Sequence, residues 1–110
     1  MAKASQAVIL PRKVAKNLEI MGEQIKLARK RRGLSIAAMA ERAQCSELTV
    51  IRAERGTPSV AIGIYARILY GLGLDEDLLT IAQKDPAGNM IVNARILNKH
   101  QKEEDYDVFD

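Results

Sequence analysis

The chain of 110 residues is poor in aromatic residues, cysteine and histidine. Trp is absent, and aromatic residues make up only 4% of the sequence. This argues against an aromatic-rich β-sandwich and against a stacking platform for single-stranded nucleic acid. One Cys and one His, Cys45 and His100, allow no disulfide framework and too few ligands for a zinc site. We therefore expect no metal and no cofactor, and no enzymatic activity, because a Ser-His-Asp set cannot be assembled.

Long hydrophobic runs are missing as well. No apolar run approaches the roughly 20 residues that a membrane-spanning helix needs. Residues 7–10 form an apolar stretch that is far too short for the hydrophobic region of a signal peptide. Together with the absence of paired cysteines, this leads us to expect a cytoplasmic protein with no membrane partner.

The charged residues are unevenly distributed along the chain. Residues 1–55 carry twelve Lys and Arg against five acidic residues, whereas residues 56–110 carry five against nine. The first half is therefore strongly basic although the whole chain has a net charge of only +3. A basic half favours a polyanionic partner, with nucleic acid the leading candidate. The alternative is an ordinary solvated basic surface.

Helical periodicity dominates the first three quarters of the sequence. Apolar residues recur at spacings of three and four from Val14 to Ala28 and predict a helix over 12–32, which Gly22 could divide in two. Capping and turn residues predict four further helices over 36–43, 47–55, 60–70 and 76–82, capped by Ser35, Ser46, Ser59 and Asp75. No strand-like alternation occurs between 11 and 83, so we expect an all-α fold with five helices.

These elements define three expected parts of the chain. Residues 1–11 are expected to form a flexible N-terminal arm, 12–83 the helical domain, and 84–110 a C-terminal extension. A breaker at 85–89 precedes a short apolar patch at 90–97, whose periodicity does not decide between strand and helix. The acidic tail that follows reads either as a disordered end or as a segment that binds a partner.

The segment from Ser35 to Gly56 has the form of two short helices joined by a tight turn. In a helix-turn-helix, the second helix enters the major groove and presents its first residues to base edges. Close packing of two helices needs small facing residues, which Ala40, Ala43, Val50 and Ala53 supply. Helical spacing places five residues of the second helix on its outward face: Glu47, Leu48, Ile51, Arg52 and Arg55. The alternative to a helix-turn-helix is an ordinary α-hairpin in a bundle.

The outward residues suit the chemistry of base edges. Arg52 could pair with guanine through two hydrogen bonds, Glu47 could accept from cytosine, and Leu48 could touch a thymine methyl. Thr49 could be either a base contact or a packed polar group. Leu48 and Ile51 are also apolar residues on an expected surface, which suits a groove contact or a protein interface.

Several motifs in register resemble the Xre, or Cro/lambda-repressor-like, helix-turn-helix family over about residues 20–82. The run from Gly22 to Ser35 is similar to the family's first helix and turn. Residues 39–43 resemble its second helix, and residues 49–56 its recognition helix with the "E-x-G" ending. Residues 58–59 and 69–74 match its "P-S" linker and the end of its fourth helix.

This resemblance implies a lambda-repressor-like five-helix domain and specific residue roles. Arg29 and Glu54 would form a structural ion pair that locks the first helix onto the third. Ser35 and Arg55 would contact DNA phosphates. The residues facing the groove would be Ser46, Glu47, Leu48 and Arg52. Gln44 departs from the family by replacing the usual Gly in the turn, where a left-handed conformation has some cost.

A narrower resemblance extends into the C-terminal part. Residues 72–78 and 85–88, followed by a short apolar segment and a charged tail, are similar to HipB-type regulators. This resemblance implies an autorepressor and antitoxin that acts with a HipA-like kinase toxin and binds a palindromic operator as a homodimer. Residues 90–97 would then pair as a short strand across the dimer axis. The alternative is a protein-interaction module that neutralises a toxin or bridges transcription proteins, with little DNA binding of its own.

Overall fold

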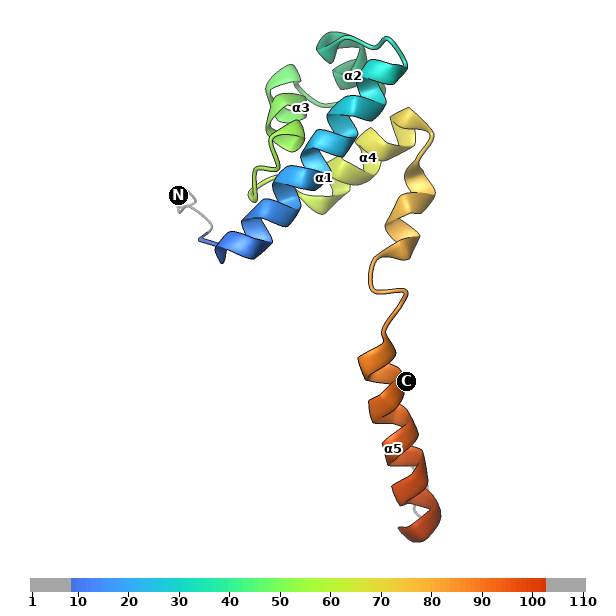
Figure 1. The fold of residues 1–110 in the computed structure, drawn as a ribbon. Helices are drawn as coiled ribbons and strands as arrows, with labels where there is room; N and C mark the ends of the chain where they lie inside the picture. Colours follow the sequence, from blue (N-terminus) through green and yellow to red (C-terminus); the bar gives the residue numbers. More distant parts are fainter. Residues whose placement is uncertain (1–8, 103–110) are drawn as a thin grey trace. The chain divides into compact units, whose positions relative to one another are not determined.

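The computed structural model describes residues 9–102, and all regular secondary structure in that range is helical (Figure 1). No strand occurs among the described residues, so the predicted all-α fold class is confirmed for them. The elements, in chain order, are α1 (Arg12–Arg31), α2 (Ile36–Ala43), α3 (Glu47–Glu54), α4 (Ile62–Leu72), the 3-10 helix η2 (Asp75–Thr80) and α5 (Pro86–Lys102).

The chain divides into two compact units, Met1–Leu78 and Leu79–Asp110. The first unit contains α1 to α4, and the second contains α5. The limits 1–11, 12–83 and 84–110 that we derive from the sequence remain a prediction. Most of the expected N-terminal arm and all of the acidic segment 103–110 lie outside the described residues.

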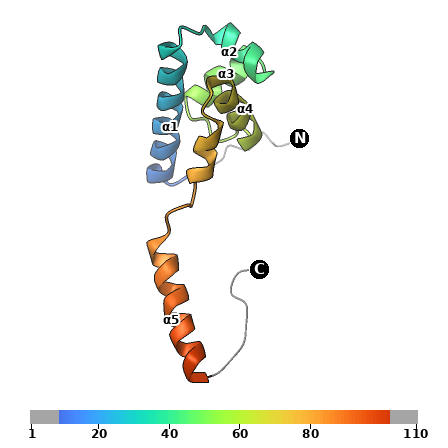
Figure 2. The ribbon, with the colours of Figure 1, turned by 90° about the vertical axis from the view of Figure 1, so that its right-hand side faces the viewer.

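The core of the first unit lies between α1 and a group of three helices on one side of it. Figure 2 shows α2, α3 and α4 gathered on the same side of α1. As predicted, Ala40 and Ala43 of α2 and Val50 and Ala53 of α3 are buried, so the two helices meet through small side chains. The other buried apolar residues are Ile25, Ala28, Met39, Tyr65, Ile68 and Leu72.

The first helix, predicted over 12–32, is continuous through Gly22, so the alternative of two segments does not occur. Two other predicted helix limits are wrong. α4 begins at Ile62 rather than at Val60, because the N–H of Val60 is held in a turn by the carbonyl of Thr57 at 3.3 Å. The fifth helix, predicted over 76–82, is the short 3-10 helix η2, and Ala82 cannot continue it because its φ is +60°.

The predicted strand at residues 90–97 is also wrong, since this segment lies within α5. The preceding breaker acts as a helix start. Pro86 occupies the first helical position, where a missing N–H costs nothing. The carboxylate of Asp85 accepts a hydrogen bond from the N–H of Gly88 at 3.0 Å, as an N-cap residue does. A strand here would have needed a partner strand, which the described part of the chain does not offer.

Candidate nucleic-acid interface

The turn between α2 and α3 is closed by backbone geometry at Gln44. This residue adopts a left-handed conformation, with φ of 55° and ψ of 50°. The N–H of Cys45 then donates to the carbonyl of Ala40 at 3.0 Å, which ends α2 and redirects the chain. The carbonyl of Gln44 also accepts a hydrogen bond from Arg67 on α4 at 3.2 Å. The turn is therefore anchored to a third helix, and α3 leaves it in a fixed direction.

Ser46 begins α3 as an N-cap. Its Oγ accepts a hydrogen bond from the backbone N–H of Thr49 at 3.0 Å and lies 2.8 Å from the hydroxyl of the same residue. Ser46 is exposed and Thr49 is half-buried. The two hydroxyls thus hold each other at the start of α3. A contact to DNA from either of them would have to share this hydrogen bond.

α3 has a buried face and an exposed face. Val50, Ala53 and Glu54 are buried. The predicted groove residues Glu47 and Arg52 and the predicted phosphate contact Arg55 are exposed, and Leu48 is 51% exposed although it is a large apolar residue. Ile51, which is predicted to point outward, is only partly exposed. The outward surface of α3 is consequently narrower than helical spacing suggests, and Leu48 is its one large apolar group with high exposure.

A buried ion pair fixes α3 against α1. The Nε of Arg29 lies 2.6 Å from one carboxylate oxygen of Glu54, and its Nη2 lies 3.1 Å from the other. The remaining terminal nitrogen donates to the carbonyl of Leu34 at 2.8 Å. Both side chains are more than nine-tenths buried. The hydrogen bond to Glu54 raises the pKa of the Arg29 guanidinium, against the opposing effect of burial.

Two glycines allow α1 to touch the end of α3 at backbone distance. A Cβ on Gly22 would lie 2.6 Å from the carbonyl oxygen of Glu54 and 2.8 Å from that of Ala53. A Cβ on Gly56, which follows α3 with φ of +74°, would collide with the backbone of Leu18. The sequence reading treats Gly22 only as a weak point of its helix. Its spacing of seven residues from Arg29 places both on the same face and could have revealed the contact.

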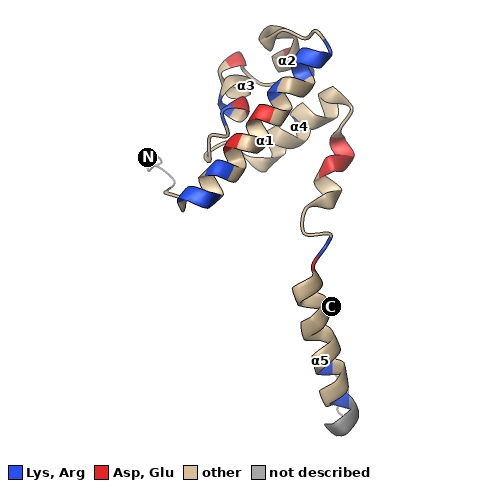
Figure 3. Cartoon of the chain, in the orientation of Figure 1, with Lys and Arg blue, Asp and Glu red and all other residues tan. Residues whose placement is uncertain are grey.

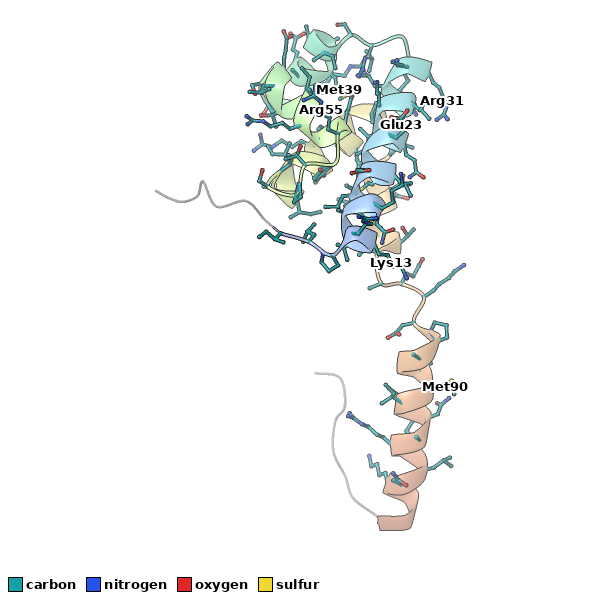
Figure 4. The ribbon with its side chains drawn as sticks, turned by 60° about the vertical axis from the view of Figure 1, so that its left-hand side comes forward. Lys13, Glu23, Arg31, Met39, Arg55 and Met90 are labelled. Carbon is teal, nitrogen blue, oxygen red and sulfur yellow. The ribbon has the colours of Figure 1, made fainter. Side chains whose placement is uncertain are left out.

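The end of α1 and the start of α2 form a second polar region of this unit. Ser35 is exposed and caps α2, with its Oγ accepting from the N–H of Ala38 at 3.0 Å. Lys30 and Arg31 precede it and are also exposed. Figure 3 shows Lys and Arg at both ends of α1 and acidic residues in its middle. In Figure 4, Lys13 and Arg31 lie toward opposite ends of α1, with Glu23 between them.

An open groove of about 550 Å³ runs beside α3. Ile36 and Ile51, both partly exposed, form its apolar part. Lys26 and Arg55 bring positive charge to its wall, whereas Glu19 and Glu23 of α1 bring negative charge. An anionic ligand such as DNA is therefore attracted to one side of the groove and repelled by the other.

Other kinds of site find little support in the described residues. Over residues 9–102, no cluster of His, Cys, Asp and Glu could hold a metal ion, and no helix is both long and apolar enough to cross a membrane. Cys45 is half-buried, and burial raises the pKa of its thiol, against an opposing effect of Arg67. The side chain of His100 and the acidic segment after Lys102 lie outside the described part.

The chain matches a protein-family model. Residues 20–80, more than half of the chain, match a family model described as a helix-turn-helix domain. The matched range begins within α1 and ends at the last residue of η2, so it contains α2, the turn and α3. No curated protein matches the chain.

Proposed function

The chain belongs to the helix-turn-helix domain family, and from this premise we propose that it is a sequence-specific transcriptional regulator that binds double-stranded DNA. In proteins of this design, the second helix of the motif lies in the major groove while the first crosses the DNA backbone. Here α3 is the groove helix and α2 is the crossing helix.

The observation that carries this proposal is the division of α3 into two faces. Val50 and Ala53 are buried and Glu54 is held by Arg29, so the helix cannot rotate about its axis. Glu47, Leu48 and Arg52 consequently remain on the solvent side. A guanidinium, a carboxylate and an apolar group on three exposed positions can discriminate guanine, cytosine and thymine.

Contacts to DNA phosphates would come from residues around this reading face. Ser35 lies at the N-terminus of α2, where unpaired N–H groups favour an anion. Arg55 lies just after α3, and Lys30 and Arg31 lie at the end of α1. Such contacts release counterions from DNA, so binding by this surface would weaken steeply as the salt concentration rises.

We further propose that the protein binds as a homodimer to a palindromic operator. Two copies of α3 would then enter successive major grooves about one helical turn apart. An operator upstream of its own gene would make the protein an autorepressor. The likeness of its C-terminal pattern to HipB-type regulators supports a role as antitoxin to a HipA-like kinase toxin, in the cytoplasm.

A second candidate is a protein-interaction module that neutralises a toxin or bridges transcription proteins. The observation in its favour is the exposure of apolar side chains, 51% for Leu48 and 70% for Met90. In this case deletion of residues 84–110 would abolish capture of a co-encoded partner, and DNA binding would be weak with or without the deletion.

The test is selection of binding sites from randomised duplexes, followed by titration of single base-pair variants of the selected site. Arg52→Ala should relax the preference at one base pair, at a cost of about 1–3 kcal/mol for the preferred base. Lys84→Ala removes the same charge from an exposed position outside the matched range and should leave the preference unchanged. A uniform loss over all sequences would make Arg52 a phosphate contact, and recovery of no preferred site would reject the proposal.

A further inference from the structure

α5 carries an apolar stripe of exposed side chains. Met90 is 70% exposed, Leu97 is 66% exposed and Ile91 is 55% exposed. Figure 4 shows Met90 projecting outward from this helix. Isolated helices of 17 residues are marginal in water, and this one also contains Gly88 and three Asn. A helix of this composition gains stability when its apolar stripe is covered.

The stripe has the spacing of a helix that packs lengthwise against another helix. Ala87, Met90, Ala94 and Leu97 follow one another at intervals of three, four and three residues. This is the alternation of the two core positions in a coiled coil. The positions on either side of the stripe carry no charge: they are Ile91, Asn93 and Asn98. A second helix can therefore lie along this seam without burying an ionised group.

Small and large residues alternate along the seam, and this alternation favours one orientation. In a parallel pair, identical positions face each other, so that Ala meets Ala and the next layer joins two large side chains. In an antiparallel pair, each Ala faces a large residue, and every layer has about the same width. Uniform layers of small against large residues are what allows two helices to interdigitate along their whole length.

We infer that α5 pairs with α5 of a second copy of this chain in antiparallel orientation, which gives four layers. Ala87 packs on the partner's Leu97 and Met90 on the partner's Ala94, and the two-fold axis repeats both contacts. Ile91 lies beside the axis and adds apolar contact there. The seam extends over about 15 Å, from a rise of 1.5 Å per residue between Ala87 and Leu97.

The charge pattern of the C-terminal part supports the same orientation. All the charged residues of α5, Arg95, Lys99 and Lys102, are basic and lie in its second half. Five acidic residues follow within residues 103–110. A parallel pair would bring the basic residues of the two helices side by side, whereas an antiparallel pair carries Lys99 and Lys102 of the two copies toward opposite ends of the seam. Repulsion between like charges therefore disfavours the parallel form.

This inference rests on the proposed function in one respect. The proposed palindromic operator requires a homodimer, and the pair of α5 helices supplies it. Four layers form a short seam, so the dimer is expected to be weak in free solution. Two DNA-binding domains joined by it bind a two-site operator more tightly than either alone, because the second site is engaged at a high effective concentration. The operator in turn stabilises the dimer.

The first test measures the mass of the full-length protein by sedimentation equilibrium over a series of concentrations. The unaltered chain should associate to a dimer. Leu97→Glu should weaken association at least about tenfold, a loss of about 1.4 kcal/mol. Ile96→Glu is the matched control, because Ile96 is 44% exposed and lies off the seam by helical spacing. A monomer at all concentrations, or equal effects of the two substitutions, would overturn the inference.

The second test determines orientation by disulfide cross-linking. Cys45→Ser removes the only native thiol, and Ala87→Cys and Leu97→Cys are then made separately in that background. On mixing and oxidation, the antiparallel pair predicts a mixed disulfide between the two variants and little cross-linking of either with itself. Rapid self-cross-linking of each variant would show a parallel pair and overturn the proposed orientation.

These outcomes are separable from those of the DNA-binding experiment. Selective DNA binding by a protein that stays monomeric would overturn the α5 pairing and leave the regulator proposal standing. If instead the unaltered chain forms a dimer that Leu97→Glu dissociates, but no preferred DNA site is found, the α5 pairing stands and the regulator proposal is overturned. Far-UV circular dichroism of each variant distinguishes loss of association from unfolding of the first unit.

Discussion

Gly22→Ala tests whether close contact between α1 and α3 fixes the position of the reading helix. The added Cβ would lie 2.6 Å from the carbonyl oxygen of Glu54 and 2.8 Å from that of Ala53. Both obstacles are backbone atoms, so they cannot be relieved by a change of side-chain rotamer. Either α1 or α3 must move, and the buried ion pair between Arg29 and Glu54 opposes that movement.

The magnitude follows from two opposing effects. Alanine in a helix interior is favoured over glycine by about 1 kcal/mol. Overpacking of a close contact costs about 1–3 kcal/mol, and a contact with rigid backbone belongs at the upper end of that range. We therefore expect Gly22→Ala to lower the free energy of unfolding by about 2 kcal/mol. We also expect a loss of DNA affinity in the folded protein, because α3 is displaced.

Urea unfolding monitored by far-UV circular dichroism measures this change. Gly63→Ala is the matched control, because Gly63 lies in α4 and a Cβ there would meet nothing within 4 Å. The control should be as stable as the unaltered chain or more stable, by up to about 1 kcal/mol. If Gly22→Ala were also stabilising, and bound DNA normally, the reasoning about close packing would be refuted.

Four further predictions concern the same unit. Glu54→Ala leaves Arg29 buried without its partner and should lower the free energy of unfolding, measured in urea, by about 3–5 kcal/mol. An equal loss on replacement of an exposed acidic residue by Ala would contradict a structural role of the ion pair. Gln44→Gly should raise the free energy of unfolding, also measured in urea, by about 0.5–1 kcal/mol. The left-handed conformation costs a residue with a Cβ about 1–2 kcal/mol, and relief of this cost outweighs the larger conformational entropy that glycine loses on folding. Glu23→Gln should strengthen binding to all DNA sequences alike, as measured by titration at low salt, and a sequence-dependent change would contradict a purely electrostatic effect. Cys45 should react with iodoacetamide more slowly than a free thiol at neutral pH, since its raised pKa leaves less thiolate, and a faster reaction would contradict that shift.

Local signals in the sequence account for much of the first unit. Ser35 and Ser46 cap helices because a hydroxyl before a helix can satisfy a free N–H, and this requires no knowledge of distant residues. The left-handed turn at Gln44 follows from the resemblance of the surrounding motif. The burial of Val50 and Ala53 follows from helical spacing.

Features that depend on tertiary contacts could not be read in the same way. The role of Gly22 is set by the backbone of Ala53 and Glu54 in α3, far from Gly22 along the chain. Ile51 lines a groove to which α1 and α2 also contribute, so its surroundings depend on residues that are distant in the sequence. The apolar patch at 90–97 fits either period, and only the cap at Asp85 distinguishes a helix start from a simple break.

One titration tests whether α3 reads DNA sequence. The protein is titrated against the DNA upstream of its own gene and against a scrambled duplex of equal length and composition, at two salt concentrations. We predict a preference of at least about a hundredfold for the upstream DNA, with both affinities falling as salt rises. Equal and weak binding to the two duplexes would contradict it.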